Sequence, residues 1–224
     1  MSFSLCKILL LSAGIGVLSG CAQDFPKISM DDNTKTLNEM LNTTIAEDDD
    51  YDSKVQLASI YFSHNYIDQA NELLSSLVSE NPNHAEAAAW FGANNCKLAA
   101  RSTPWLMGLR KLYRVNKCLH QVEEALAKAP DDFTVRLISI NTGLEVAMFD
   151  AYEKGKTELM SLRSEINTSP NKYPPGALSH YYMAEAKLAG LENDLENKNT
   201  YLKKIIALDA DSTLVEAAQV EMAL

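Results

Sequence analysis

Cys21 is the residue whose position in this sequence points most directly to chemistry. It follows an uncharged, mostly apolar run that begins at Ile8, directly after the single basic residue Lys7. A membrane-spanning helix needs about 20 consecutive apolar residues, and this run is shorter. A short basic start, a brief apolar core and an exit of small residues are typical of a secretory signal peptide. The pattern therefore predicts that residues 1–20 are a signal peptide and take no part in the fold.

The exit from this run, "LSGC" at residues 18–21, resembles the bacterial lipobox in all four positions. In that family the cysteine thiol receives a diacylglycerol, the chain is cut before the cysteine, and the new amino terminus is acylated, as with palmitate. The resemblance implies a lipid anchor on Cys21. Ala22 follows, and a residue other than aspartate there usually permits export to the outer membrane in enteric bacteria. The alternative is an ordinary signal peptide that happens to end beside a cysteine.

The chain without its first 20 residues is strongly acidic. Loss of Lys7 leaves 19 of the 20 basic residues against 30 Asp and Glu, a formal charge of −11. This balance argues against nucleic acid as a partner and against broad attraction to anionic membranes. The length suffices for one or two domains with a sizeable core. No second apolar run is long enough to span a bilayer, so we expect contact with the membrane through the lipid alone.

Motifs that position a reacting group or a metal ion are absent from the sequence. There is no GxSxG elbow, HExxH helix, phosphate-binding glycine loop, dinucleotide fingerprint or CxxC pair. The histidines are isolated, and the acidic run at residues 47–50 lacks the spaced ligands and glycine of a calcium loop. That run instead suits the start of the next helix, whose dipole favours negative charge. We predict no enzyme activity, no cofactor and no metal site; an enzyme with unmarked catalytic residues is the alternative.

Residues 21–50 are polar and contain few large apolar side chains. Leu37, Met40, Leu41 and Ile45 are spaced to make one short amphipathic helix, but little else in the segment supports a core. We therefore interpret residues 21–50 as a flexible tether that lets the folded part sit roughly 30 Å from the bilayer.

From Asp52 almost to the end of the chain, apolar residues recur at helical spacing and strand-like alternation is absent. Turn-forming clusters interrupt the pattern near residues 81, 103, 131, 169 and 175. Each is followed by a fresh amphipathic run, which is typical of a string of antiparallel helices.

The first of these helical pairs, residues 51–82, resembles a tetratricopeptide repeat, a unit of 34 residues built from two helices. The residues at its expected positions are Leu57, Ala58, Tyr61, Ala70, Leu74 and Pro82. Asn65 stands at the turn where glycine is usual, and asparagine tolerates the left-handed conformation well. The second pair departs from the repeat by about 14 extra residues near 99–112. The resemblance implies an all-α fold, a right-handed superhelix of antiparallel helix pairs over residues 51–224.

The first helix of each such pair lines the concave face of the superhelix, where partners bind. The family's contact positions fall on Val55, Ser59, Phe62, Ala89, Ala93 and Lys97. A groove of small and apolar residues suits an extended peptide or an amphipathic helix. The alternative is that these side chains cover a neighbouring repeat, as Phe62 in particular would.

A basic segment interrupts the acidic chain, because no Asp or Glu occurs between Glu86 and Glu123. The residues that define this insertion are Arg101, Trp105, Arg110, Lys111 and Arg114. Its apolar and basic residues fall on separate faces of one helix, which suits an anionic surface or an acidic partner. The alternative is a longer repeat helix that packs its apolar side inward, and we favour that packing.

Cys96 and Cys118 are the remaining thiols once Cys6 leaves with the signal peptide and Cys21 carries lipid. If the interrupted second pair folds back on itself, a bridge would close a loop of 22 residues. Two unpaired thiols are uncommon in an oxidising compartment, which favours the bridge. The repeat register, however, directs Cys96 to the groove and Cys118 to the helix interface, so both possibilities stay open.

Together these features predict a lipid-anchored scaffold or adaptor on the periplasmic face of the cell envelope that binds another envelope protein or peptide through its groove. The alternative is an accessory lipoprotein for a small hydrophobic ligand. It depends on the run "LRKLYRVNKCLHQVEEAL", which resembles the lipoprotein T-components of TRAP transporters. A scaffold requires an open groove, whereas a ligand carrier requires an enclosed apolar pocket of roughly 300 Å³ or more.

Overall fold

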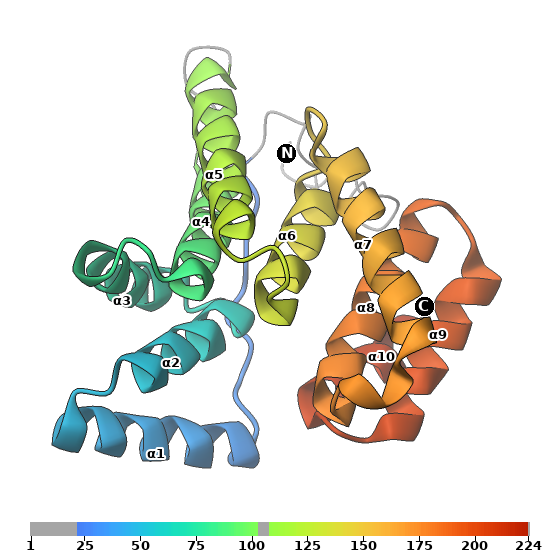
Figure 1. Cartoon of the computed structure of the whole chain (residues 1–224), viewed down its shortest axis with the longest axis horizontal. Coiled ribbons are helices and arrows are strands. Elements are labelled where there is room, and N and C mark those ends of the chain that lie inside the picture. Colours follow the sequence, from blue (N-terminus) through green and yellow to red (C-terminus); the bar gives the residue numbers. More distant parts are fainter. Residues whose placement is uncertain (1–21, 103–107, 224) are drawn as a thin grey trace, which may run out of the picture. The chain divides into compact units, whose positions relative to one another are not determined.

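The computed structural model describes residues 22–102 and 108–223, and every regular element in these residues is helical. The elements are α1 (Asp32–Asp48), α2 (Tyr51–Ser63), α3 (Ile67–Glu80), α4 (Ala85–Arg101), α5 (Leu109–Lys128), α6 (Phe133–Val146), α7 (Ala151–Thr168), the short 3-10 helix η3 (Pro170–Lys172), α8 (Pro175–Leu191), α9 (Leu195–Leu208) and α10 (Ser212–Met222) (Figure 1). The predicted all-α class is confirmed. The proposed signal peptide, Cys21 and Trp105 lie outside the described residues.

The described chain forms two compact units, and the boundary between them falls inside α6. The first unit ends at Thr142 and the second begins at Gly143. Gly143 itself allows a close approach, because a Cβ added there would lie 2.5 Å from the carbonyl oxygen of Ala151 at the start of α7. Each unit has its own buried clusters, and each is described separately below.

Several helices begin at an aspartate, which explains the acidic stretches between elements. Asp50 precedes α2, and its side chain accepts a hydrogen bond from the backbone N–H of Ser53 at 2.7 Å. Hydrogen bonds from Ser53 lower the pKa of the Asp50 carboxyl. Asp31 and Asp211 cap α1 and α10 in the same way. The acidic run at residues 47–50 thus ends in a helix cap, as its position before a helix predicted.

In the first unit, α1 packs against α2 and is not part of a flexible tether. Leu41 is 6% exposed and lies in a cluster with Leu57 and Ile60 of α2, with Leu37 and Ile45 packed beside it. The apolar residues of α1 were too few to predict a core of their own. They need none, because α2 supplies the other half of the interface.

The residues before α1 are also fixed to the folded unit, although they have no regular secondary structure. The backbone N–H of Gln23 donates to the carbonyl oxygen of Ala100 at 3.0 Å. The N–H of Ile28 donates to His64 O at 3.0 Å, and the Asn65 side chain donates to Pro26 O at 2.9 Å. The predicted tether over residues 21–50 is therefore wrong for its described part, since backbone hydrogen bonds hold residues 22–31 on α4 and on the turn after α2.

The helices α2 and α3 meet through small side chains. Ala58 and Ala70 are both fully buried, and Leu74 and Leu77 of α3 complete the cluster with Val55. Asn65, in the turn between these helices, has φ of 58°, the left-handed conformation expected for that position. The first helical pair therefore has the close approach and the turn that its sequence predicted.

In the second unit, the buried charged side chain of Glu185 is engaged by its neighbours. Glu185 of α8 is 1% exposed, and its carboxylate accepts from Arg163 Nε of α7 at 2.7 Å and from the Tyr181 hydroxyl at 2.5 Å. Burial and the adjacent Glu185 raise the pKa of Tyr181, so this phenol keeps the proton that it donates. Because Arg163 and Tyr181 both donate to it, this buried carboxylate is not left unpaired.

We predict that Leu41→Ala destabilises the first unit by about 2–5 kcal/mol, because it removes a buried side chain from the interface between α1 and α2. The matched control is Met40→Ala on the same helix, where the side chain is 61% exposed. That variant should change the free energy of unfolding by less than about 0.5 kcal/mol. Urea unfolding of both variants measures the difference. Equal, negligible effects would show that α1 is not docked.

Candidate functional site

The residues predicted to line a partner-binding groove lie largely in the core of the first unit. Val55 is 3% exposed, Ala89 is fully buried and Ala93 is 4% exposed. Val55 belongs to the cluster between α2 and α3, whereas Ala89 and Ala93 pack with Val135 and Ile138 of α6. The groove assignment is therefore wrong for these three residues, because neighbouring helices of the same unit cover them.

The other three predicted groove residues make local contacts within the first unit. Lys97 Nζ lies 3.8 Å from the centroid of the Phe62 ring and donates to Phe62 O at 2.9 Å and to Asn65 Oδ1 at 2.8 Å. Phe62 also contacts Trp90, with 5.1 Å between ring centroids. The Ser59 hydroxyl donates to the carbonyl oxygen of Gln56 at 2.8 Å, one turn earlier. Phe62 thus covers the next helical pair, which was the alternative interpretation.

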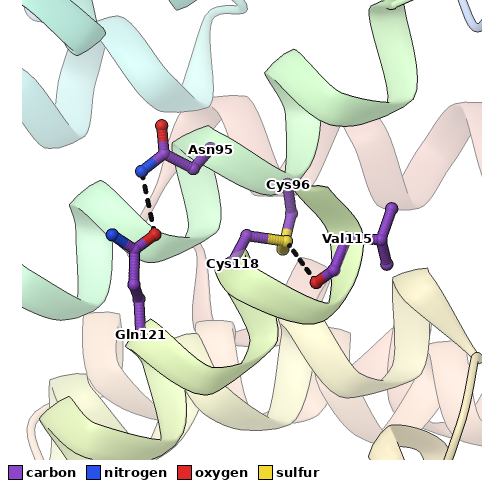
Figure 2. The surroundings of a disulfide bond; sticks show 5 residues. All are labelled: Asn95, Cys96, Val115, Cys118 and Gln121. Carbon is purple, nitrogen blue, oxygen red and sulfur yellow. Dashed lines mark hydrogen bonds between the residues drawn. A yellow bond between two sulfur atoms is a disulfide. The ribbon is translucent and has the colours of Figure 1, made fainter. Parts of the chain in front are cut away.

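A disulfide joins Cys96 of α4 to Cys118 of α5, with 5.3 Å between the two Cα atoms. Figure 2 shows the bridge between the two helices, which pack closely along their lengths. The repeat register had directed the two thiols to different surfaces. Gly92 explains why the two thiols meet. A Cβ at this position would lie 2.8 Å from Val122 Cγ2, so the lack of a side chain at Gly92 lets α4 and α5 approach closely enough for a disulfide.

A polar contact beside the bridge also joins the two helices. Asn95 Nδ2 donates to Gln121 Oε1 at 2.9 Å, one residue before Cys96 and three after Cys118 (Figure 2). Cys118 Sγ lies 3.0 Å from the carbonyl oxygen of Val115, a close contact without a proton, since a disulfide sulfur has none to donate. Both cysteines are buried, so the bridge is shielded from solvent.

A hollow of about 610 Å³ lies between α3, α4 and α5, directly beside the disulfide. On α4 it is lined by residues one helical turn apart, among them Phe91, Asn95 and Leu98. On α5 its lining includes Arg114, Lys117 and Gln121; on α3 it includes Asn71. The size is within the range of ligand pockets, about 300–1,000 Å³. We call this feature the α4–α5 hollow.

The α4–α5 hollow is basic in a chain that is acidic overall. Its lining contains Arg101, Arg114 and Lys117 and no carboxylate. Arg101 is already paired with Asp68, because its two terminal nitrogens donate to the Asp68 carboxylate at 3.0 and 2.5 Å. These hydrogen bonds lower the pKa of Asp68. Within the described residues no ion pair is recorded for Arg114 or Lys117. These two cations are therefore available to a ligand.

The predicted basic insertion is divided between the core and the surface. Lys111 is 7% exposed, so it does not belong to an exposed basic face as predicted. Arg101, Arg110 and Arg114 are exposed. The apolar side chains of this stretch do not all pack inward, since Leu109 and Tyr113 are 62% and 68% exposed. The expectation that this stretch packs its apolar side inward is therefore wrong for these two residues.

In residues 22–102 and 108–223, no group of three or more His, Cys, Asp or Glu side chains is placed to hold a metal ion. In the same part of the chain, no helix has both the length and the apolar character needed to cross a membrane.

Comparison with known proteins gave no match: no family model, no curated protein and no solved structure resembles this chain significantly. The α4–α5 hollow is therefore assessed from its own chemistry.

The sequence contained a signal for the hollow that motif searching missed. Phe91, Asn95 and Leu98 on α4 are four and three residues apart, and Arg114, Lys117 and Gln121 on α5 are three and four residues apart. Such spacing places them on one face of each helix. Only the pairing of α4 with α5, fixed by the disulfide, brings these two faces together.

We predict that replacing both cysteines by alanine lowers the free energy of unfolding of the first unit by about 2–4 kcal/mol, because the bridge restricts the unfolded chain. Urea unfolding with and without a reductant measures this effect. The reductant should destabilise the parent protein and leave the double variant unchanged. If the unfolded, non-reduced parent takes up alkyl groups at Cys96 and Cys118, there is no bridge.

Proposed function

We propose that this protein is a lipid-anchored helical-repeat scaffold of the bacterial envelope that binds an acidic segment of another envelope protein in the α4–α5 hollow. The observation that carries the proposal is the lining of the hollow, which has three cationic side chains and no carboxylate. The chain as a whole has a formal charge of −10, so this concentration of positive charge is local. It replaces the groove predicted on α2 and α4.

The chemistry of the hollow suits a short acidic peptide. An arginine such as Arg114 can bind a carboxylate through two parallel hydrogen bonds, and Lys117 adds a point charge beside it. The amides of Asn71, Asn95 and Gln121 can donate to and accept from a peptide backbone. Phe91 and Leu98 provide apolar contact area. A side chain with a carboxylate next to an apolar residue would therefore use the whole lining.

The resemblance of residues 51–82 to a tetratricopeptide repeat supports a scaffold role. The full burial of Ala58 and Ala70 and the left-handed turn at Asn65 agree with that repeat. We propose antiparallel pairing of α2 with α3, α4 with α5, and α8 with α9, as the superhelix of such repeats requires. Stacked pairs of this kind present binding surfaces and require no catalytic group.

A carrier of small hydrophobic ligands is less well supported. Such a ligand would place apolar surface against Arg114 and Lys117 and would leave their charges without a partner. An enclosed apolar pocket is what that function requires, whereas the α4–α5 hollow combines charged, amide and apolar side chains.

Attachment to the envelope is proposed from the lipobox-like residues and from the disulfide. The buried bridge between Cys96 and Cys118 suits an oxidising compartment such as the periplasm. A lipid on Cys21 would hold the protein on the periplasmic face, and Ala22 favours the outer membrane.

Cys21→Ser should abolish incorporation of labelled palmitate and release the protein from the membrane fraction, because serine offers no thiol for the lipid. Bacterial cells that express the full chain provide the assay, with Cys6→Ser as the matched control that keeps both properties. A Cys21→Ser chain that still incorporates palmitate would contradict the proposed anchor.

Arg114→Glu combined with Lys117→Glu should weaken binding of a labelled peptide of alternating glutamate and alanine. Loss of a charge-assisted hydrogen bond costs about 1.5–3 kcal/mol, so the affinity should fall by at least about tenfold. Lys203→Glu with Lys204→Glu, exposed on α9, is the control with the same change in charge. Fluorescence anisotropy measures both. Equal affinity for the corresponding glutamine–alanine peptide would contradict recognition of carboxylates.

A further inference from the structure

The first turns of α5 present large apolar side chains to solvent. Leu109 is 62% exposed, Leu112 is 39% exposed and Tyr113 is 68% exposed. Their spacing of three and four residues places them on one side of the helix, away from the buried stripe that includes Val115 and Cys118. Grouped exposed apolar residues mark contact surfaces.

Basic side chains flank this cluster. Arg110 and Lys117 are exposed on α5, and Arg114 lies between them on the same helix. Within the described residues no ion pair is recorded for any of the three. The Asp68 carboxylate near this end of α4 is bound by Arg101. Apolar side chains beside free cations are the composition of a helix that lies on an anionic lipid surface.

The amino-terminal segment places the proposed lipid at this same end of the first unit. Gln23 is hydrogen-bonded to Ala100, and the neighbours of Ala100, Ala99 and Arg101, line the α4–α5 hollow together with Arg114. Figure 1 shows the chain before α1 passing along α4, to which Gln23 is hydrogen-bonded. Only one residue separates Cys21 from Gln23, so their Cα atoms can be no more than about 7 Å apart.

We propose that the first turns of α5 form a membrane-contact surface for anionic phospholipids, composed of Leu109, Arg110, Leu112, Tyr113 and Lys117. The proposal rests on the lipid anchor at Cys21 proposed above. A lipid fixed so close to Ala100 leaves no length for a spacer, and therefore this end of the α4–α5 pair must face the bilayer. The exposed apolar side chains enter the headgroup region, and the basic ones bind lipid phosphates.

The acidic character of the whole chain does not prevent this contact. Charges beyond about 10 Å are largely screened at physiological salt, so the local cations dominate at the surface. Each basic residue near an anionic membrane strengthens binding by about fivefold. The membrane-contact surface shares Lys117 with the α4–α5 hollow, whereas Leu109, Arg110, Leu112 and Tyr113 do not line that hollow.

The test is vesicle flotation of the mature chain carrying Cys21→Ser, which has no lipid of its own. Vesicles of phosphatidylcholine are compared with vesicles that also contain phosphatidylglycerol. The chain should float with the mixed vesicles, and salt of roughly 0.5 M should release it. Arg110→Glu with Lys117→Glu should reduce binding by at least about 25-fold, at about fivefold per residue. Leu109→Ser with Tyr113→Ser should reduce it by about tenfold.

The control pair Lys203→Glu and Lys204→Glu carries the same change in charge on α9 and should bind as the parent does. All the altered side chains are exposed, so each variant should fold. An unchanged circular dichroism spectrum checks this. Failure to float with mixed vesicles, equal binding to both vesicle types, or equal losses in the test and control pairs would each overturn the proposal. Palmitate labelling tests the proposed anchor at Cys21 separately from flotation. A failure of the anchor and a failure of the membrane-contact surface can therefore be told apart.

Discussion

In the first unit α4 contacts α2, α3, α5 and α6, and small side chains on α4 allow the closest of these approaches. Ala87, Ala89 and Asn94 are fully buried, and Ala93, Cys96 and Ala99 are nearly so. Helix axes approach as closely as their side chains permit, so each small residue admits a neighbour. Gly92 admits α5, and Ala89 and Ala93 admit α6. Asn94 donates to the carbonyl oxygen of Ile67 at the start of α3, and Trp90 contacts Phe62 of α2.

The candidate site follows from this packing. The disulfide at Cys96 holds α5 against α4, and the carbonyl oxygen of Ala100 near the helix end receives the N–H of Gln23. The same end of α4 therefore brings together the α4–α5 hollow, the basic turns of α5 and the chain leading to Cys21. In our proposal a peptide-binding site and a membrane-contact surface are neighbours, which would hold an acidic partner close to the bilayer.

Sequence patterns predicted the features that depend on local spacing. The helices, the left-handed turn at Asn65 and the close approach through Ala58 and Ala70 all follow from residues within one helical pair. The groove prediction failed for a longer-range reason. The resemblance to a repeat predicted partner contacts at Val55, Ala89 and Ala93, but neighbouring helices of the first unit cover these residues. No spacing within α4 reveals that α6 returns to pack on it.

The amino-terminal segment shows the same limit. A polar stretch with few apolar residues is typical of a tether, yet residues 22–31 are bound by backbone groups, which every sequence has. Leu41 likewise needs α2 to be buried. The disulfide was only partly predictable from the sequence. The loop length between the cysteines permitted a bridge, but the close approach of the two helices depends on the missing side chain at Gly92.

The central claim is that α4 holds the amino-terminal segment beside the basic end of α5. Amide hydrogen exchange of the mature chain, followed by NMR, tests it most directly. The N–H groups of Gln23 and Ile28 should exchange slowly, because they donate to Ala100 and His64. The amides of Phe25 and Lys27, which make no backbone hydrogen bond within residues 22–102 and 108–223, should exchange rapidly. Rapid exchange of all four, with α4 still protected, would contradict the account.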